Sequence, residues 1–255
     1  MINLNNFKVY YEPFPHLIFS EIFDENLYSA ICKEFPEIDK LELMKDKIQN
    51  ENKQIKYNLS DRHPSKKEFV NFIKKCSYLK ILYNYLVSEK FYEEINKILL
   101  KNYIDIGIKK LNKGISIKAQ ILKFLFNIRI STSIEFSAIS CNSGFLKPHT
   151  DGSNKIFSFV IPIIDNDKIM NHKNLGTSIR APIDDQYKYN FHNKTVPFEL
   201  TKEIKEIPFK KNQLFLFIKT HNSLHSVGPI ISNKTDNEIL FRKSITGFLE
   251  KTYNF

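Results

Sequence analysis

A chain of 255 residues can bury a substantial single core, and 42% of its residues are hydrophobic against 26% charged. With 22 Phe and 12 Tyr, this composition excludes an intrinsically disordered chain. The net charge of +10 is spread along the whole chain without a recognised nucleic-acid-binding motif, so it indicates a compositional bias rather than a nucleic-acid surface.

No segment has the features of a membrane span or of a secretory signal. The longest apolar runs, 121–126 and 156–164, fall far short of the roughly 20 residues that a spanning helix needs. The first residues lack a basic cap followed by an apolar stretch, which predicts a cytoplasmic protein. Three scattered cysteines without a C-x-x-C pair predict neither a disulfide framework nor a zinc site; they are Cys32, Cys76 and Cys141.

The first half of the chain has mainly helical patterns. Residues 7–23 alternate and indicate short extended pieces, followed by a helix that Asp24 caps. Residues 40–68 are polar and Lys-rich with weak periodicity, which predicts a surface loop or cover. From 67 to 100, apolar residues recur every three or four positions, so we expect two or more amphipathic helices that back a sheet.

From about residue 124 the sequence changes to short β-rich segments separated by turn residues. The segments are 128–140, 156–164, 177–180, 214–218, 223–227 and 239–249. They predict an all-β barrel or jelly-roll core. We therefore expect an α+β fold in a single domain, 1–255, in which a helical N-terminal portion, 1–124, buttresses one sheet of a β core, 125–255.

A candidate metal site begins at His149 and Asp151, which are two residues apart. On an extended backbone such residues project to the same face, so one metal ion can contact both. A second His from a distant strand completes a two-His-one-carboxylate site, which leaves positions open on Fe(II) for a co-substrate and O₂. His225, soon after a predicted strand, is our candidate, and His221 competes with it because residues four apart share a face of an extended chain.

Arginine is scarce in this chain, and one of its positions stands out. Arg242 shares a face of the last predicted strand with Ser244, and a guanidinium beside a hydroxyl suits bidentate capture of a carboxylate. Arg180 has two readings, as a contact for an anionic substrate group or, more commonly, as a solvated loop residue. Lys155 and His172 lie near the predicted mouth of the site, and we expect them to be solvated rather than catalytic.

The order H-x-D, then His, then R-x-S resembles the Fe(II)/2-oxoglutarate dioxygenase superfamily, in particular its prolyl-hydroxylase-like branch, over most of the chain. Other matching stretches are Pro13-Phe14-Pro15-His16, Gly144-Phe145-Leu146-Lys147-Pro148-His149-Thr150-Asp151, Gly176-Thr177-Ser178 and Pro208-Phe209-Lys210-Lys211-Asn212. The resemblance implies a double-stranded β-helix with iron at one open end. It implies iron ligation by His149, Asp151 and His225. It further implies that Arg242 and Ser244 hold the distal carboxylate of 2-oxoglutarate.

The resemblance also implies an activity. The cofactors would be Fe(II), 2-oxoglutarate as co-substrate and O₂, with ascorbate as a stimulant, and a substrate C–H bond would be hydroxylated with release of succinate and CO₂. Asp151 stands where related halogenases have Gly or Ala, which favours hydroxylation over halogenation. Cys141 or a small neighbour stands where many relatives have a Tyr that can contact 2-oxoglutarate.

The substrate expected from the sequence is a small polar metabolite or glycan precursor. Three other readings remain open at this level. They are a peptide or protein side-chain hydroxylase, a non-catalytic β-helix binding module, and a cupin-type metal enzyme that has no use for Arg242. The sequence predicts no oligomeric state.

Overall fold

The computed structural model describes residues 2–43, 56–62, 64–107, 128–190, 192–232 and 239–253. Its helices are α1 (Glu25–Glu34), α2 (Lys66–Lys75), α3 (Tyr78–Leu86) and α4 (Glu89–Lys101). Its strands are β1 (Phe7–Tyr10), β2 (His16–Ser20), β3 (Glu42–Leu43), β4 (Lys56–Ser60), β5 (Ile128–Ser140), β6 (Leu146–His149), β7 (Lys155–Ile163), β8 (Thr177–Pro182), β9 (Thr201–Ile207), β10 (Gln213–Ile218), β11 (His225–Val227) and β12 (Phe241–Tyr253).

The strands form two antiparallel sheets. The larger has eight strands in the order β1-β2-β10-β7-β12-β5-β4-β3, and the smaller has four in the order β6-β11-β8-β9. Side chains from both sheets line one cavity, so the sheets face each other across it. The predicted combination of helices with antiparallel sheet is confirmed. Among the described residues, no helix is both long and apolar enough to cross a membrane.

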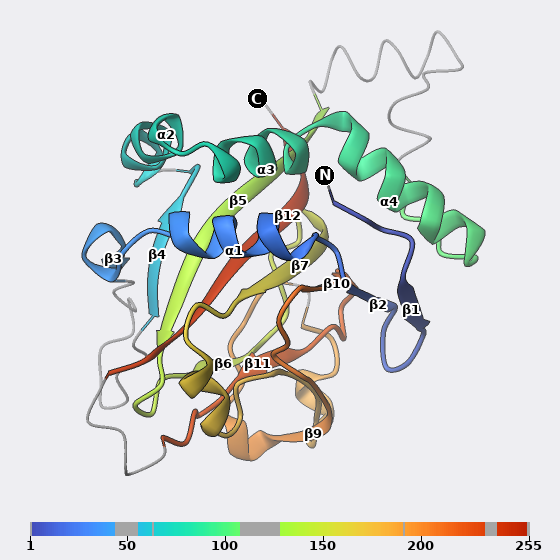
Figure 1. Ribbon diagram of the computed structural model, residues 1–255. Coiled ribbons are helices and arrows are strands. Elements are labelled where there is room, and N and C mark those ends of the chain that lie inside the picture. Colours follow the sequence, from blue (N-terminus) through green and yellow to red (C-terminus); the bar gives the residue numbers. More distant parts are fainter. Residues whose placement is uncertain are drawn as a thin grey trace, which may run out of the picture.

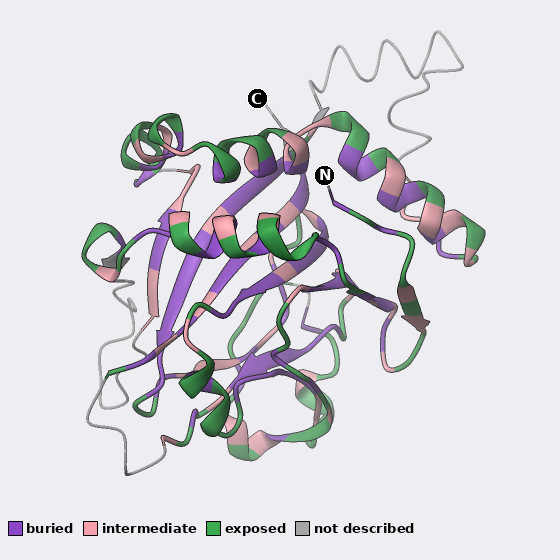
Figure 2. Cartoon of the chain, in the orientation of Figure 1, coloured by how far each residue is buried: buried purple, intermediate pink, exposed green. Residues whose placement is uncertain are grey.

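The helices cover the face of the larger sheet that points away from the smaller sheet, and α1 and α3 cross in front of β5, β12 and β7 (Figure 1). Their buried sides face the sheet and their exposed sides face outward (Figure 2). Aromatic rings fill this layer: Phe69 of α2 stacks on Phe136 of β5 with ring centroids 5.3 Å apart, and Phe91 of α4 meets Phe159 of β7 at 5.3 Å. The predicted helices therefore do back a sheet.

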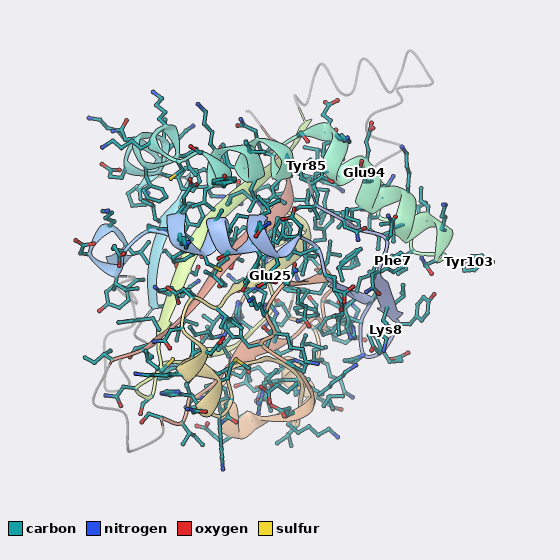
Figure 3. All side chains as sticks on the ribbon, in the orientation of Figure 1. Phe7, Lys8, Glu25, Tyr85, Glu94 and Tyr103 are labelled. Atoms are coloured by element: carbon teal, nitrogen blue, oxygen red, sulfur yellow. The ribbon has the colours of Figure 1, made fainter. Side chains whose placement is uncertain are left out.

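Local hydrogen bonds fix where the helices begin and how they join. Asp24 caps α1, since its side chain accepts from the backbone N–H of Leu27 at 2.8 Å, as the sequence predicted. The Tyr85 hydroxyl of α3 donates to the Glu94 carboxylate of α4, and the two side chains lie together in Figure 3. This contact ties two consecutive helices into one layer.

One expectation from the sequence is wrong at residues 56–60, which form β4 rather than a surface loop. Leu59 of this strand is 1% exposed and packs in the core, whereas Lys56 and Asn58 line the cavity. Polar Lys56, Asn58 and Ser60 do alternate with Tyr57 and Leu59, but the strand has only five residues within a polar, Lys-rich stretch, where so short an alternation is easily overlooked. The predicted loop also spans 44–55, which lies outside the described residues.

The N-terminal portion is not purely helical. It supplies β1 to β4, and these flank β10, β7, β12 and β5 from the second portion in one sheet. Close packing between two strands of that sheet requires a glycine at position 247. A Cβ added to Gly247 of β12 would lie 2.1 Å from Cζ of Phe159 on the neighbouring strand β7. The Phe159 ring thus occupies the space that any larger residue would need.

Candidate metal centre

Three ligating side chains meet where β6 ends and β11 begins. The two strands pair antiparallel with His149 opposite His225, and Asp151 follows His149 by two residues. The candidate ligand atoms of these three residues all lie within 4.8 Å of one another. The structure therefore brings together the three residues that the sequence spacing singled out.

Backbone carbonyls orient both imidazole rings. Nδ1 of His149 lies 2.8 Å from the carbonyl oxygen of Lys147, and Nδ1 of His225 lies 3.0 Å from that of Ser223. Because a carbonyl oxygen can only accept, each Nδ1 must carry the proton and donate it. The lone pair of each Nε2 is then available, which is the tautomer that a metal-ligating His adopts.

Burial sets the charge states of the three groups. Burial, followed by the nearby His225, lowers the pKa of His149 to about 3, and burial likewise lowers the pKa of His225. Burial alone would raise the pKa of Asp151, but Lys155 and the two imidazoles hold that pKa well below its usual range. Two neutral nitrogen donors and one carboxylate result, a set that suits Fe(II) with positions left open.

Two side chains hold the Asp151 carboxylate. Nζ of Lys155 lies 2.8 Å from Oδ1, and the hydroxyl of Ser158 donates to Oδ2. The Lys155 side chain is only 13% exposed, and its Nζ lies 3.2 Å from the ring centroid of Phe248. The expectation that Lys155 is solvated is therefore wrong, because the turn before β7 folds this side chain back over Asp151, with the backbone N–H of Lys155 donating to Gly152 at 3.1 Å.

His172 also departs from its expected solvated state. It is 7% exposed, and its Nδ1 lies 3.2 Å from the carbonyl oxygen of Ile169. It terminates a short 3₁₀ helix, Asp167–Asn171, which packs its ring inward, and it does not line the cavity. Its place is thus structural.

Arg242 is a buried cation at the start of β12. Its side chain is 4% exposed, its Nε donates to the carbonyl oxygen of Leu175, and Nη2 donates to Thr177 Oγ1 at 3.4 Å. Burial lowers its pKa to about 10, so the guanidinium stays charged at neutral pH. Within the described part of the chain, no carboxylate lies within ion-pair distance of it. A buried guanidinium that faces a cavity without a protein counter-ion fits an anionic ligand.

The metal group and Arg242 line the same cavity, which has a volume of about 610 Å³. Ser244, two residues after Arg242, is 2% exposed and lines it as well. Cavities of several hundred Å³ hold small-molecule ligands. The same cavity can therefore hold a metal ion at the three ligands and an anionic group at Arg242.

Two alternatives from the sequence lie away from this cavity. His221 is exposed and stacks on Tyr189 with ring centroids 4.9 Å apart, so it is not part of the metal group. Arg180 lines a separate cavity of about 300 Å³, where its Nε donates to Thr201 Oγ1 at 2.7 Å. Cys141 is buried, and burial raises the pKa of its thiol to about 11.

Sequence reasoning missed the polar side chains that complete the cavity. Besides Ser158, they include Lys56, Asn58, Arg62, Glu135 and Ser137. A usable signal exists for β5, because polar Ser133, Glu135 and Ser137 alternate with apolar Ile134, Phe136 and Ala138. That alternation marks a strand with one face toward a polar space.

No family model and no curated protein matches this chain. Among solved structures, it is similar to a prolyl-4-hydroxylase from Pseudomonas putida, with a TM-score of 0.46 and 11% sequence identity over 92% of this chain and 91% of that chain. It is also similar to a Trichoplax adhaerens prolyl hydroxylase solved in complex with a hypoxia inducible factor oxygen degradation domain peptide fragment, with a TM-score of 0.45 and 10% identity over 92% and 83% of the two chains.

A third similar structure is an oxidoreductase of the 2OG-Fe(II) oxygenase family from Burkholderia pseudomallei, with a TM-score of 0.29 and 14% identity over 56% of this chain and 54% of that chain. The solved structures similar to this chain thus include prolyl hydroxylases and another 2OG-Fe(II) oxygenase. Because these identities are 10–14% and the TM-scores are below 0.5, the assignment of a function rests on the side chains of the cavity itself.

Proposed function

We propose that this protein is an Fe(II)- and 2-oxoglutarate-dependent dioxygenase. His149, Asp151 and His225 would hold the iron, and Arg242 with Ser244 would hold the distal carboxylate of 2-oxoglutarate. The observation that carries the proposal is that one cavity combines a His-Asp-His group with a buried arginine that lacks a counter-ion among the described residues. The metal group alone would suit a cupin-type enzyme, which has no use for the arginine.

When bound, Fe(II) supplies the oxidising chemistry by which 2-oxoglutarate and O₂ become succinate and CO₂ while a substrate C–H bond is hydroxylated. The chain's part is to bind and to orient. The backbone carbonyls behind each Nδ1 aim both imidazoles, while Lys155 and Ser158 fix the carboxylate of Asp151.

Apolar side chains lie beside the metal centre. The ring of Phe217 on β10 lies 4.5 Å, between centroids, from the ring of His225. Val160 and Ile139 line the cavity on the larger sheet, and Val227 lines it on the smaller one. An apolar surround strengthens the ionic hold of Arg242 on a carboxylate, since charges interact more strongly in a low-dielectric site.

The arrangement of strands supports two further elements of this proposal. The facing sheets fit a double-stranded β-helix built from the portion 125–255, and the strands that 1–124 adds to the larger sheet fit a single domain over 1–255. A non-catalytic binding module could keep such a fold. A binding module would not require a complete set of three metal ligands, each held by a hydrogen bond. The presence of that set favours an enzyme.

The test is metal-dependent binding and turnover of 2-oxoglutarate. Calorimetric titration of 2-oxoglutarate into the purified protein, with and without Mn(II), should give tight binding only in the presence of the metal. With Fe(II) in air, the protein should release succinate slowly even without substrate. Binding that is equally tight without metal, together with no succinate above a protein-free control, would overturn the proposal.

A further inference from the structure

The cavity extends beyond the metal centre to a wall formed by β4 and β5. Asn58 pairs with Ser137, and Ser60 pairs with Glu135, so the two strands present their polar side chains side by side. We call the cavity-lining residues of this region the polar wall; they are Lys56, Asn58, Arg62, Glu135 and Ser137. None of them belongs to the proposed iron or 2-oxoglutarate sites.

Glu135 offers the polar wall's free acceptor. Its Oε1 receives Nζ of Lys56 at 3.0 Å and the hydroxyl of Ser137 at 2.8 Å, whereas Oε2 accepts no hydrogen bond from any residue that the structure describes. Burial alone would raise the pKa of Glu135, but Lys56 and Ser137 hold it below its ordinary value, so the group is ionised. An ionised oxygen with 15% of its side chain exposed, facing a cavity, fits a positively charged donor on a ligand.

Lys56 offers free donors beside Glu135. An ammonium has three N–H donors, and the Lys56 side chain, 15% exposed, gives one of them to Glu135. Arg62 gives Nη2 to Glu250, and its Nε is buried, so Arg62 adds positive charge to the polar wall rather than an accessible donor. Lys56 begins β4 and Arg62 follows its end, so positive charges stand at both ends of this strand.

This distribution of charge discriminates between classes of ligand. A purely cationic molecule would meet Glu135 but also Lys56, Arg62 and the nearby Lys155. A purely anionic molecule would leave Glu135 without its donor, and an uncharged polyol would cover charged groups without compensating them. A molecule with both an ammonium and a carboxylate group satisfies both kinds of group at once.

We infer that the polar wall is the substrate subsite and that it takes a free amino acid, with the ammonium on Oε2 of Glu135 and the carboxylate on Nζ of Lys56. The cavity of about 610 Å³ has room for a small molecule beside 2-oxoglutarate. The inference rests on the proposed function, because it sets the substrate next to the metal centre.

The experiment is a calorimetric titration of the standard L-amino acids into the protein loaded with Mn(II) and 2-oxoglutarate. The tightest binder is then compared with its decarboxylated amine and with its deaminated acid. Each loses one charge-assisted contact, so each should bind about tenfold more weakly or worse. Binding by no amino acid, or equal binding of either analogue, overturns the inference.

Two variants separate recognition from folding. Glu135→Gln should weaken the amino acid by about tenfold or more while the deaminated acid binds as it does to the wild type, a pattern that misfolding cannot give. Asp165→Asn is the matched control, since this carboxylate pairs with Lys243 at 2.6 Å outside the cavity and should leave both affinities unchanged. Equal weakening of both ligands in Glu135→Gln overturns the assignment of the ammonium to Glu135.

Failure of the inference is distinguishable from failure of the proposed function. The same titrations report the affinities of the wild-type protein for Mn(II) and for 2-oxoglutarate. A protein that binds neither contradicts the proposed function. A protein that binds both but no amino acid contradicts the substrate class alone.

Discussion

His149 on β6 and His225 on β11 are direct partners across an antiparallel strand pair, and their ring centroids lie 4.5 Å apart. This register creates the metal group. A slip by one residue would turn one of the two rings to the other face of the sheet. Two residues far apart in the chain therefore depend on a strand of three residues, His225–Val227, for their alignment.

The first prediction separates His225 from His221. His225→Ala should lower Mn(II) affinity by at least 10- to 100-fold, because loss of even an outer partner of a ligand typically costs about that much. His221→Ala should leave the affinity unchanged, since His221 stacks on Tyr189 outside the metal group. Mn(II) titration followed by electron paramagnetic resonance measures both. A loss in His221→Ala with none in His225→Ala would reverse the assignment.

The second prediction concerns Arg242. Arg242→Met should weaken 2-oxoglutarate by about 10- to 150-fold, the loss of a charge-assisted hydrogen bond worth roughly 1.5–3 kcal/mol. Mn(II) affinity should remain, because Arg242 makes no contact with the three ligands. Calorimetry with Mn(II)-loaded protein measures the loss, and Arg180→Met, in the separate smaller cavity, is the matched control. Unchanged 2-oxoglutarate affinity in Arg242→Met would remove its anchoring role.

Much of the fold was predictable because several elements carry a strong periodic pattern. The segment 128–140 was predicted with the bounds that β5 has, and the helical spacing from 67 to 100 corresponds to α2, α3 and α4. β6 and β9 were missed for local reasons. β6 has only four residues, one of them Pro148, and β9 has a largely exposed, charged middle, with Lys202, Glu203, Lys205 and Glu206 around a single Ile204, that shows no apolar alternation.

Part of the candidate site could likewise be predicted from the sequence, and part of it could not. The spacing of His149 and Asp151 on an extended chain, and the position of His225 after a strand, could be recognised without a structure. The contact of Lys56 with Glu135 could not be recognised from the sequence. It depends on the pairing of β4 with β5, and nothing in the sequence indicates that these two segments pair. The hold of Ser158 on Asp151 likewise needs the turn between β6 and β7 to be known.

The third prediction tests that hold. Ser158→Ala removes the hydroxyl that donates to Oδ2 of Asp151 and should lower Mn(II) affinity by about 10- to 100-fold without unfolding the protein. Ser158→Thr keeps a hydroxyl and should restore part of the affinity. The comparison of the two by Mn(II) titration distinguishes a hydrogen bond from mere packing. Equal affinities in Ser158→Ala and the wild type would show that Lys155 alone positions the carboxylate.

The last prediction concerns stability and pH at Asp61, which burial gives a pKa raised from 3.8 to about 6. Its Oδ1 is buried without a partner among the described residues. A raised pKa contributes stability that is present below pH 3.8 and is lost as the pH rises through about 6. Asp61→Asn should therefore raise the free energy of unfolding at pH 7.5, by on the order of 2 kcal/mol, and by about half as much at pH 5. Urea denaturation of EDTA-treated protein measures both.

The control is Asp185→Asn. The side chain of Asp185 is 83% exposed, so this substitution should change the free energy of unfolding little at either pH. A variant no more stable than the wild type at pH 7.5 would contradict the buried charge at Asp61.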